Sequence, residues 1–527
     1  MGQYSRRDVL RGGGLLAVAG GGSGLLAACS GTSAGSTKSA PIRAHIVSAV
    51  NASGALALDP RVGADAGTFF VKKSVFSTVT SVNPVTGVVT PLLAAEMPTQ
   101  IDAHTWQVKL KPNVRFQDGS LMTADDLAFT LNSMNSKSLN SLYTAIFGGW
   151  SATAKDSTTV IISLAKPFAN VPTRLGILAV VPQKVVERVG NKAFGLHPVG
   201  TGPFNFVSWP GASQAAPITV KRARSYSLGA LPLVGGASLT TILDDSARID
   251  SLLSGVSDIC TRVPQNLYAT LSGSVTKAEG NGSTYDAIML NNNKAPFNDK
   301  RVRQAVAHAI DRSAIIKTVW DGLALPAYGP LPPWHWAYNP NGVELSYDAA
   351  TARSLLAQAG YSSGGPEIEL MFPNSTSSTA MGTIVMAQLQ AAGFKVTPKT
   401  GEVNSLYGPV FNRTFQAFVM YGNTGLFGYD PDIWYRWLYY GSPGTFLNVT
   451  PAQQAPIDRA IDAAANISPS DRTAQKNAYF ALQNMLAEEC EMVHIDCRYN
   501  VQAWSKSLHN YSISPDNIPD LLAASWQ

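Results

Sequence analysis

A short apolar segment followed by an amphipathic one, between Tyr285 and Arg312, most constrains the fold of this chain. Residues 285–290 are mostly apolar and bounded by polar residues, as expected of a buried strand. From Asp299 onward the apolar residues recur at helical spacing, and Asn298 occupies the position of an N-cap. The pattern predicts a strand that leads into a helix. This arrangement is common and indicates no function by itself.

Length and composition indicate a folded protein of several domains. The chain has 527 residues, more than one ordinary core accommodates, so two or three domains are expected. Hydrophobic residues make up 45% and charged residues 14%, below the typical share of about a quarter. The formal net charge is +5, to which Arg6, Arg7 and Arg11 contribute from the N-terminus. No run of Lys and Arg predicts a nucleic-acid groove, so no nucleic-acid partner is expected.

Helical and strand-like segments alternate in the second half of the chain. One helical pattern runs from Asp348 and ends before Gly360. Another runs from Ile384 and ends before Gly393, and both glycines suit a helix C-terminus. The alternation predicts an α/β lobe with a largely parallel sheet. The shorter, strand-like segments are 368–372, 394–396 and 415–421.

Two segments in the first half carry specific patterns. Apolar and polar residues alternate from Trp106 to Leu110, which predicts a half-buried strand. Thr123, with Asp126 three residues later, forms a capping-box pattern at the start of a helix. Residues 197–204, His-Pro-Val-Gly-Thr-Gly-Pro-Phe, predict a tight turn into a strand, because their spacing does not match a phosphate-binding loop.

Together these segments resemble the extracellular solute-binding proteins of family 5, the peptide- and nickel-type receptors of ABC importers. One match is Asn-x(4)-Pro-Phe-x-Asp-x-Arg-Val-Arg-Gln-Ala, which starts at Asn291. A second is Trp-x-Val-x-Leu-x(3)-Val-Arg-Phe-x-Asp-Gly-x(3)-Thr-Ala-Asp-Asp-Leu-Ala-Phe, which starts at Trp106. The others are Pro-x-Gly-Thr-Gly-Pro-Phe from Pro198 and the segment 252–259. The resemblance covers nearly all of the chain after residue 40.

The resemblance implies an α/β protein with a two-lobe, periplasmic-binding-protein-like fold, type II and cluster C-like. The chain would cross between the lobes near Ala287 to Asn293 and again near His494 to Asn500. A ligand would bind between the lobes and favour their closed arrangement. The expected segments are lobe one at 41–284, an inserted subdomain at about 75–200, lobe two at 285–495, and a return to lobe one at 496–527.

The N-terminus resembles a lipoprotein export signal. Residues Ser5 to Arg11 resemble a twin-arginine signal, and residues 12–28 are too short and glycine-rich for a stable membrane span. The Leu-Ala-Ala-Cys-Ser sequence at Cys29 looks like a lipobox, which implies lipid attachment at this cysteine. We therefore expect a signal at 1–29 and a flexible tether at 30–40. The alternative is an ordinary signal peptide with a chance cysteine.

Three cysteines, Cys260, Cys490 and Cys497, would remain in the mature protein. An exported protein permits a disulfide, and the pairing among the three stays open. Cys490, His494 and Cys497 could suggest a metal site. Zinc sites usually have four ligands, however, and the strand pattern of residues 491–501 would point these side chains to different faces. No metal site is expected.

The residues from Tyr421 to Tyr440 are unusually aromatic and begin at the carboxyl end of a predicted strand. α/β sheets tend to place ligands at such ends, and aromatic rings give large contact areas. Ile433, Trp437 and Tyr440 lie at helical spacing and are expected in the core. For the loop residues, ligand contact and packing both stay open. The candidate ligand-binding residues are Tyr421, Asn423, Phe427, Tyr429, Asp430 and Trp434, with Asn291 at the floor of the cleft.

The resemblance also implies a departure from the peptide-binding members of the family. In those members an aspartate shortly before a similar Asp-Pro pairs with the ligand's α-amino group. Asp430-Pro431 matches the Asp-Pro, but the upstream position is Asn423 or Phe427, and neither is acidic. Either the ligand amine uses another carboxylate, or the ligand is not an ordinary free-amine peptide. A second aromatic cluster, residues 334–338, would suit stacking on sugars or is a packed surface loop.

The resemblance implies the substrate-binding component of an ABC importer, most simply a peptide receptor that delivers its ligand to permease subunits. We expect a monomer without cofactors, held by lipid on the outer face of the bacterial cytoplasmic membrane. An oligosaccharide or other non-peptide receptor of the same family is the alternative. A secreted hydrolase is an alternative of another class, but no Gly-x-Ser-x-Gly elbow, zinc-type histidine pair or paired carboxylates support it.

Overall fold

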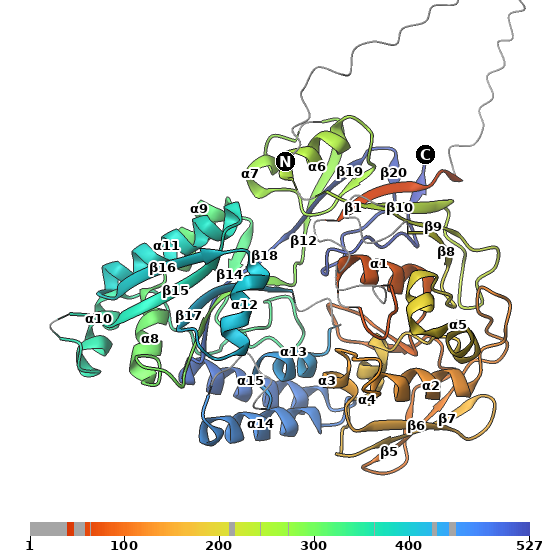
Figure 1. Cartoon of the computed structure of the whole chain (residues 1–527), viewed down its shortest axis with the longest axis horizontal. Coiled ribbons are helices and arrows are strands. Elements are labelled where there is room, and N and C mark those ends of the chain that lie inside the picture. The colour runs from red at the N-terminus through yellow and green to blue at the C-terminus, as the bar shows by residue number, and fades with distance from the viewer. Residues whose placement is uncertain are drawn as a thin grey trace, which may run out of the picture. The chain divides into compact units, whose positions relative to one another are not determined.

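The computed structural model of the chain has two principal β-sheets, which define two lobes (Figure 1). The predicted export signal, Cys29 included, lies outside the described residues. The structure describes residues 39–46, 58–63, 65–209, 217–242, 244–271, 273–362, 364–423, 429–441 and 449–527.

The sheet of lobe one is built around β1. This strand runs parallel to its two neighbours, and the remaining pairs in the sheet are antiparallel. Phe70 of α1 (Ala66–Val75) and Phe194 of α5 (Gln183–Leu196) are buried in the core of this lobe. The strand order is β12 (Val275–Gly280), β19 (Asn500–Ser505), β11 (Ile259–Cys260), β1 (Ile42–Ile46), β10 (Gly236–Thr241), β9 (Ile218–Arg222) and β8 (Phe204–Ser208).

The sheet of lobe two confirms the predicted α/β lobe, but the prediction of a largely parallel sheet is wrong, because three of its five strand pairs are antiparallel. β15 is parallel to β16 and β17, whereas β13 is antiparallel to both of its neighbours. The strand order is β14 (Ala324–Pro326), β18 (Met492–Arg498), β13 (Thr284–Leu290), β17 (Ala417–Asn423), β15 (Glu367–Pro373) and β16 (Lys395–Gly401). Helices that contribute to its core are α8 (Lys300–Ala309), α9 (Arg312–Val319), α10 (Ala349–Gln358) and α11 (Thr376–Ala392).

The segment that predicted a strand and a helix forms β13 and α8. Every residue of β13 is buried, because the strand lies between β17 and β18 in the middle of the sheet. The N-cap of α8 is Asp299 rather than Asn298, and its carboxylate accepts a hydrogen bond from the Arg301 backbone N–H at 2.9 Å. A carboxylate is favoured here, since the helix N-terminus carries a partial positive charge.

The inserted subdomain of lobe one has its own four-stranded sheet. The capping box predicted at Thr123 and Asp126 is present at the start of α2 (Ala124–Met134). Trp106 and Val108 of β5 are buried, as their alternation predicted, in a hydrophobic core that continues from the subdomain into α13 of lobe two. The strand order is β4 (Thr99–Gln100), β5 (Thr105–Lys109), β7 (Thr159–Leu164) and β6 (Trp150–Ala154).

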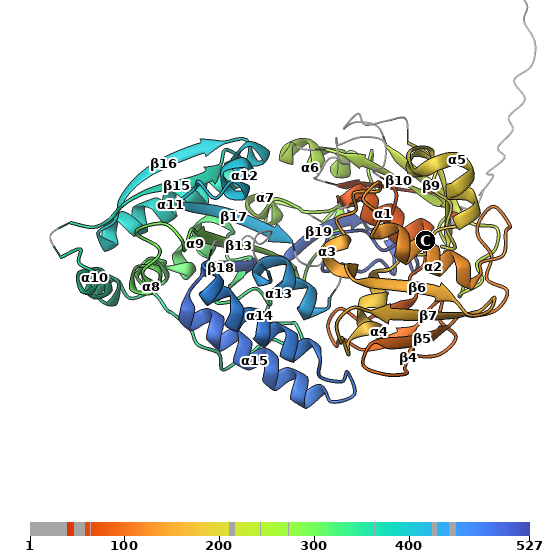
Figure 2. The ribbon, with the colours of Figure 1, turned by 60° about the horizontal axis from the view of Figure 1, so that its bottom comes forward.

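The predicted aromatic helix is α13 (Pro431–Tyr439). Ile433 is buried as expected, whereas Trp437 and Tyr440 are half-buried. Figures 1 and 2 both show α13 beside α3 (Thr144–Phe147) of the inserted subdomain. The remaining elements discussed below are α4 (Val171–Arg174), α6 (Asp245–Leu253), α7 (Gln265–Tyr268), α12 (Val403–Phe411), α14 (Pro451–Ala465) and α15 (Arg472–Glu489).

The chain crosses between the two sheets at residues 281–283 and at Tyr499. β12 and β19 belong to the sheet of lobe one, and β13 and β18 belong to the sheet of lobe two. The first crossing therefore precedes the position predicted at Ala287 to Asn293. The apolar sequence of β13 is used for a complete central strand, and the short segment before it makes the connection.

The cysteines within the described ranges are Cys260, Cys490 and Cys497, and all three are free and buried. The pairing that the sequence left open is therefore not formed in this structure. Burial raises the pKa of the Cys260 thiol to about 11 and that of the Cys490 thiol to about 12.

Candidate ligand-binding cleft

The carboxyl ends of strands from both sheets lie around a cavity of about 300 Å³. In lobe one, β10 leads to α6, and β11 is followed by Thr261 and Arg262. In lobe two, β15 leads to the first turn of α11. Ligand sites of α/β proteins lie at such strand ends. The residues of the wall that matter below are Arg248, Arg262, Thr284, Trp320, Thr376, Ser377, Arg498 and Asn517.

Arg498 stands at the crossing between the lobes and is held by a carboxylate. Its Nη2 lies 2.6 Å from Asp286 Oδ1 and its Nε 2.8 Å from Asp286 Oδ2, a bidentate pair. The guanidinium also lies 4.0 Å from the centroid of the Trp320 ring. Asp286 therefore balances the charge of Arg498 and fixes its position.

A second carboxylate lies beside this pair. Asp496 is opposite Asp286 in the β13–β18 ladder, and its Oδ2 accepts a hydrogen bond of 2.7 Å from Trp320 Nε1. Burial raises the pKa of Asp496 well above its ordinary value, and the charge of Asp286 raises it further. The raised pKa favours the protonated form of Asp496, and the carboxylate that forms the ion pair with Arg498 is that of Asp286.

Arg262 is the third arginine of the cavity wall, beside Arg248 and Arg498, and differs from them in its contacts. It is half-buried, and its backbone has φ = 51°, in the left-handed region. Within the described part of the chain its guanidinium makes no hydrogen bond, ion pair or cation–π contact. Burial lowers the pKa of Arg262, and the charges of Arg498 and Arg248 lower it further. The cavity thus holds an arginine that makes no direct polar contact with the described residues, while the charge of Asp286, which is paired with Arg498, opposes the lowering of its pKa.

Polar atoms without partners also face this cavity. The side-chain oxygen of Thr284 is buried without a hydrogen bond among the described residues, and Thr284 is 4% exposed. The carboxamide oxygen of Asn517 also has no hydrogen-bond partner among the described residues. Buried polar groups are rarely left unsatisfied, so these atoms are places where a bound molecule would complete the hydrogen bonding.

Tyr421, Asn423 and Phe427 were predicted to bind ligand. Tyr421 is 40% exposed and lines a small hollow that shares Trp320, Ser377 and Arg498 with the cavity. Asn423 ends β17 directly opposite Thr284, which places its backbone next to the cavity wall. The side chain of Asn423 and the whole of Phe427 lie outside the described residues.

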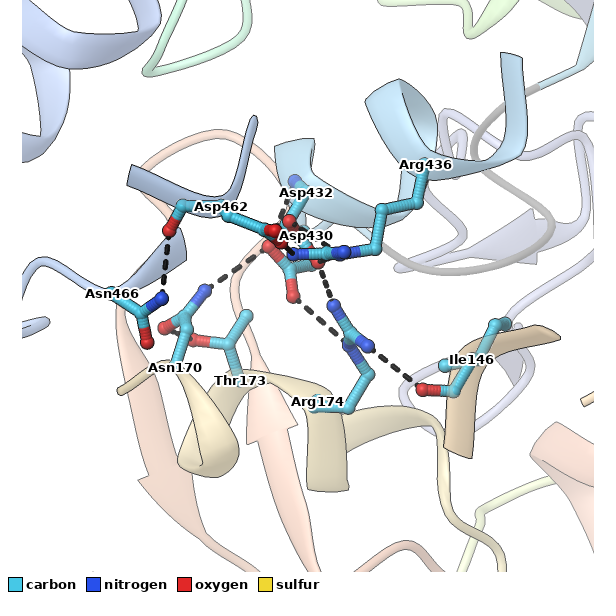
Figure 3. A network of polar contacts seen from close by, with 9 residues as sticks. All are labelled: Ile146, Asn170, Thr173, Arg174, Asp430, Asp432, Arg436, Asp462 and Asn466. Atoms are coloured by element: carbon cyan, nitrogen blue, oxygen red, sulfur yellow. Dashed lines mark hydrogen bonds and ion pairs between the residues drawn. The ribbon is translucent and has the colours of Figure 1, made fainter. Parts of the chain in front are cut away.

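Tyr429 and Asp430 line a different cavity, of about 440 Å³, together with residues of α1. Asp430 is buried, caps α13, and its Oδ1 accepts a hydrogen bond of 3.1 Å from Asn170 Nδ2. Its Oδ2 lies 3.4 Å from Arg174 Nε (Figure 3). Burial raises the pKa of Asp430 to about 6, while the charge of Arg174 opposes this rise. Asp430 is thus part of a buried network between the inserted subdomain and α13.

Trp434 and Asn291, the other two candidates, are buried away from both cavities. Trp434 packs against His335, with ring centroids 5.3 Å apart. The amide of Asn291 donates to the carbonyl oxygens of Arg413 and Phe415 at 3.1 and 2.8 Å. Asn291 directly follows the last residue of β13, whereas Thr284 is its first residue, so the two lie at opposite ends of the strand.

The two aromatic clusters of the sequence pack against each other. The Trp334 ring lies 6.3 Å from that of Tyr429, and His335 contacts Trp434 as described above. Trp336 packs edge-on to Tyr479 and beneath the Arg472 guanidinium, 3.9 Å away. These ring faces are occupied by the protein itself, so the cluster at 334–338 forms a packed loop.

Arg262, Thr284, Ser377 and Arg498 were not found from the sequence. They come from four separate segments, and only the fold brings them together. One signal was available: Ser377 lies five residues after the strand predicted at 368–372, and polar residues near strand ends often contact ligands. Across the described ranges, no group of three or more His, Cys, Asp and Glu could hold a metal ion. None of the described helices is long and apolar enough to cross a membrane.

The chain is similar to known proteins over most of its length. The family model for bacterial extracellular solute-binding proteins, family 5 Middle, matches residues 88–446, more than half of the chain. The glutathione-binding protein GsiB of Pectobacterium atrosepticum is 25% identical over 441 residues, which cover 81% of this chain and 84% of that protein.

Solved structures match nearly the whole chain. The periplasmic binding protein DppA of Helicobacter pylori, in complex with the peptide STSA, matches with a TM-score of 0.79 and 20% identity, over 92% of this chain and 98% of that one. The oligopeptide-binding protein AppA of Bacillus subtilis, in complex with a nonapeptide, matches with a TM-score of 0.77 and 21% identity, over 93% and 99%. These similarities confirm the predicted two-lobe fold. The match to the family model shows that the chain belongs to the bacterial extracellular solute-binding proteins of family 5.

Proposed function

We propose that this protein is the substrate-binding component of an ABC importer and captures peptides in the cleft between its lobes. The observation that carries the proposal is the 300 Å³ cavity, which residues of both lobes and Tyr499 of the second crossing line. The relatives named above bind glutathione, a tetrapeptide or a nonapeptide, which supports a peptide as ligand. The family is one of transport proteins, and no feature of the described part of the cleft supports catalysis.

Ligand binding would favour closure of the two lobes, because a ligand in this cavity contacts both of them. The closed form would then be the one that permease subunits recognise. Small-angle scattering with and without a saturating peptide tests this step. A smaller radius of gyration with the peptide is expected, and an unchanged radius would contradict closure.

The proposal extends to the location of the protein. We propose a twin-arginine lipoprotein signal with lipid attachment at Cys29, which would hold a monomer at the outer face of the cytoplasmic membrane. Mass spectrometry of the mature N-terminus tests the anchor. A diacylated Cys29 is expected, and an unmodified cysteine or a cut elsewhere would contradict it.

Isothermal titration calorimetry tests the ligand class. Trialanine and glutathione are expected to give saturable heats and to be recovered intact after the titration. Heat from neutral oligosaccharides alone would favour the sugar receptor instead. Release of a cleavage product would favour a hydrolase.

A further inference from the structure

We infer that the cleft holds its ligand by a carboxylate group and that Arg262 is the residue that binds it. This inference rests on the proposed function, because it assigns the anchoring group of the same cleft. It starts from the charges on the cavity wall. Arg248 forms an ion pair with Asp245, and Arg498 is paired with Asp286. Arg262 remains as the one cation of the described wall without an ion pair of its own, since the nearby Asp286 is already paired with Arg498.

A half-buried guanidinium without an ion pair destabilises the folded protein unless a ligand supplies the partner. Desolvation of a charge without a partner disfavours the folded protein, and a bound anion removes that cost. The left-handed backbone of Arg262 adds strain of a kind that clusters at ligand sites. Both features fit a side chain that is preorganised for an anion from outside the chain.

Thr284 supplies a second, independent observation. Its hydroxyl is buried, has no partner among the described residues, and belongs to the same cavity wall as Arg262. A hydroxyl can donate to a carboxylate oxygen while the guanidinium binds the other oxygen. The pair therefore offers donors from lobe one and from the first residue of β13 in lobe two.

The first turn of α11 completes the anion site from lobe two. Thr376 and Ser377 lie in this turn and line the cavity. The N-cap Ser375 makes no side-chain capping bond, and the first turn contains no acidic residue. The positive end of this 17-residue helix is therefore uncompensated and favours a negative group beside it.

The described cleft offers no free carboxylate for a ligand ammonium. The acidic residues that line the cavity and the adjoining hollow are Asp245 and Asp286, and both are paired with arginines. The positions at which the family resemblance places an amine-binding aspartate are Asn423 and Phe427. Anchoring by a carboxylate explains why this chain has neither acid there.

The test uses calorimetry on the full mature protein with trialanine, its C-terminal amide and its N-acetyl form. Amidation is expected to weaken binding about 10- to 100-fold, as for the loss of a hydrogen-bonded charge, and acetylation to change it less than about threefold. Arg262→Gln is expected to weaken the binding of free trialanine by the same factor and to leave the binding of the amide unchanged. Arg262→Lys keeps the charge and is expected to restore part of the affinity.

Arg413→Gln is the matched control. Arg413 is also half-buried with a left-handed backbone, at φ = 59°, but it does not line the cavity. Equal weakening by both Gln variants would indicate a structural effect and overturn the role of Arg262. Tight binding of the amide by the wild-type protein, or stronger loss on acetylation than on amidation, would overturn the carboxylate anchor and leave the peptide receptor intact.

Two further titrations distinguish sources of the carboxylate. Glucuronate and glucose form a sugar pair that differs by an acid group. Binding of glucuronate that depends on Arg262, with no heat from any peptide, would support the anion site and overturn the peptide function. No heat from any of these probes with the wild-type protein would overturn both.

Discussion

Arg174 of α4 joins the inserted subdomain to lobe two through Asp430, with Nε 3.4 Å from Oδ2 (Figure 3). The same guanidinium pairs with Asp432 in the first turn of α13. Arg436 extends the network, because it lies 2.8 Å from both Asp432 and Asp462 of α14. A chain of charges, buried at Arg174, Asp430 and Asp432 and partly exposed at Asp462, thus connects α4, α13 and α14.

Arg174→Met is expected to lower the free energy of unfolding by about 3 to 5 kcal/mol, because it leaves buried carboxylates short of a counter-charge. Urea denaturation at pH 7 measures the effect. Lys109→Met is the control, since its pair with Glu96 is exposed and should contribute about 0 to 1 kcal/mol. Equal effects of the two substitutions would contradict the assigned role of the network.

Glu491 predicts a pH dependence of stability. Its side chain is buried with one carboxylate oxygen unpaired within the described part of the chain, and burial raises its pKa to about 8 from an ordinary value of 4.5. Between these values the folded protein retains a proton that the unfolded chain has released. Stability therefore falls as the pH rises through this window, by up to about 1.4 kcal/mol per pH unit.

Glu491→Gln is expected to remove this dependence. Urea denaturation at pH 5, 6.5 and 8 should show that the free energy of unfolding of the variant increases relative to that of the wild-type protein as the pH rises. Glu96→Gln, at an exposed position, should follow the wild-type protein. A constant difference between Glu491→Gln and the wild type across this range would show that Glu491 does not titrate there.

Tyr421→Ala is expected to weaken trialanine binding about tenfold, because the half-exposed ring faces the hollow next to Arg498. Its unfolding free energy should change by less than about 1 kcal/mol. Tyr347→Ala removes a comparably exposed ring in lobe two outside the cleft, and should leave binding unchanged. The prediction fails if both variants bind like the wild type.

The free thiols give a chemical test of the fold. Cys260, Cys490 and Cys497 are buried, and burial raises the pKa of Cys260 and Cys490 as described above, so all three should resist Ellman's reagent at pH 8 in the native protein. In guanidinium chloride without reductant all three should react. If two of them react only after reduction, they form a disulfide, which would contradict the assignment of three free thiols.

The sequence predicted the elements of lobe two well where periodicity and caps agree. The helix before Gly360, the helix before Gly393 and the strand–helix unit of β13 and α8 all formed, since local patterning and burial favoured the same structure. The crossing was misplaced, because an apolar strand looks the same whether it spans two lobes or lies in the middle of one sheet.

The candidate site was harder to predict than the fold. The many aromatic residues at 421–440 favoured a ligand site in that segment, yet Trp434 and the cluster at 334–338 pack against each other. The cavity instead gathers Arg262, Thr284 and Ser377 from distant segments. Single polar residues at strand ends carry little signal in a sequence, whereas their convergence is evident once the two sheets are assembled.

The central claim is that ligand binds in the 300 Å³ cavity between the lobes. A crystal structure of the mature protein with bound trialanine tests it most directly. The peptide is expected in that cavity, with its carboxylate within hydrogen-bond distance of the Arg262 guanidinium and near the first turn of α11. Peptide bound instead in the 440 Å³ cavity beside Tyr429 and Asp430, with the Arg262 guanidinium unoccupied, would contradict the claim.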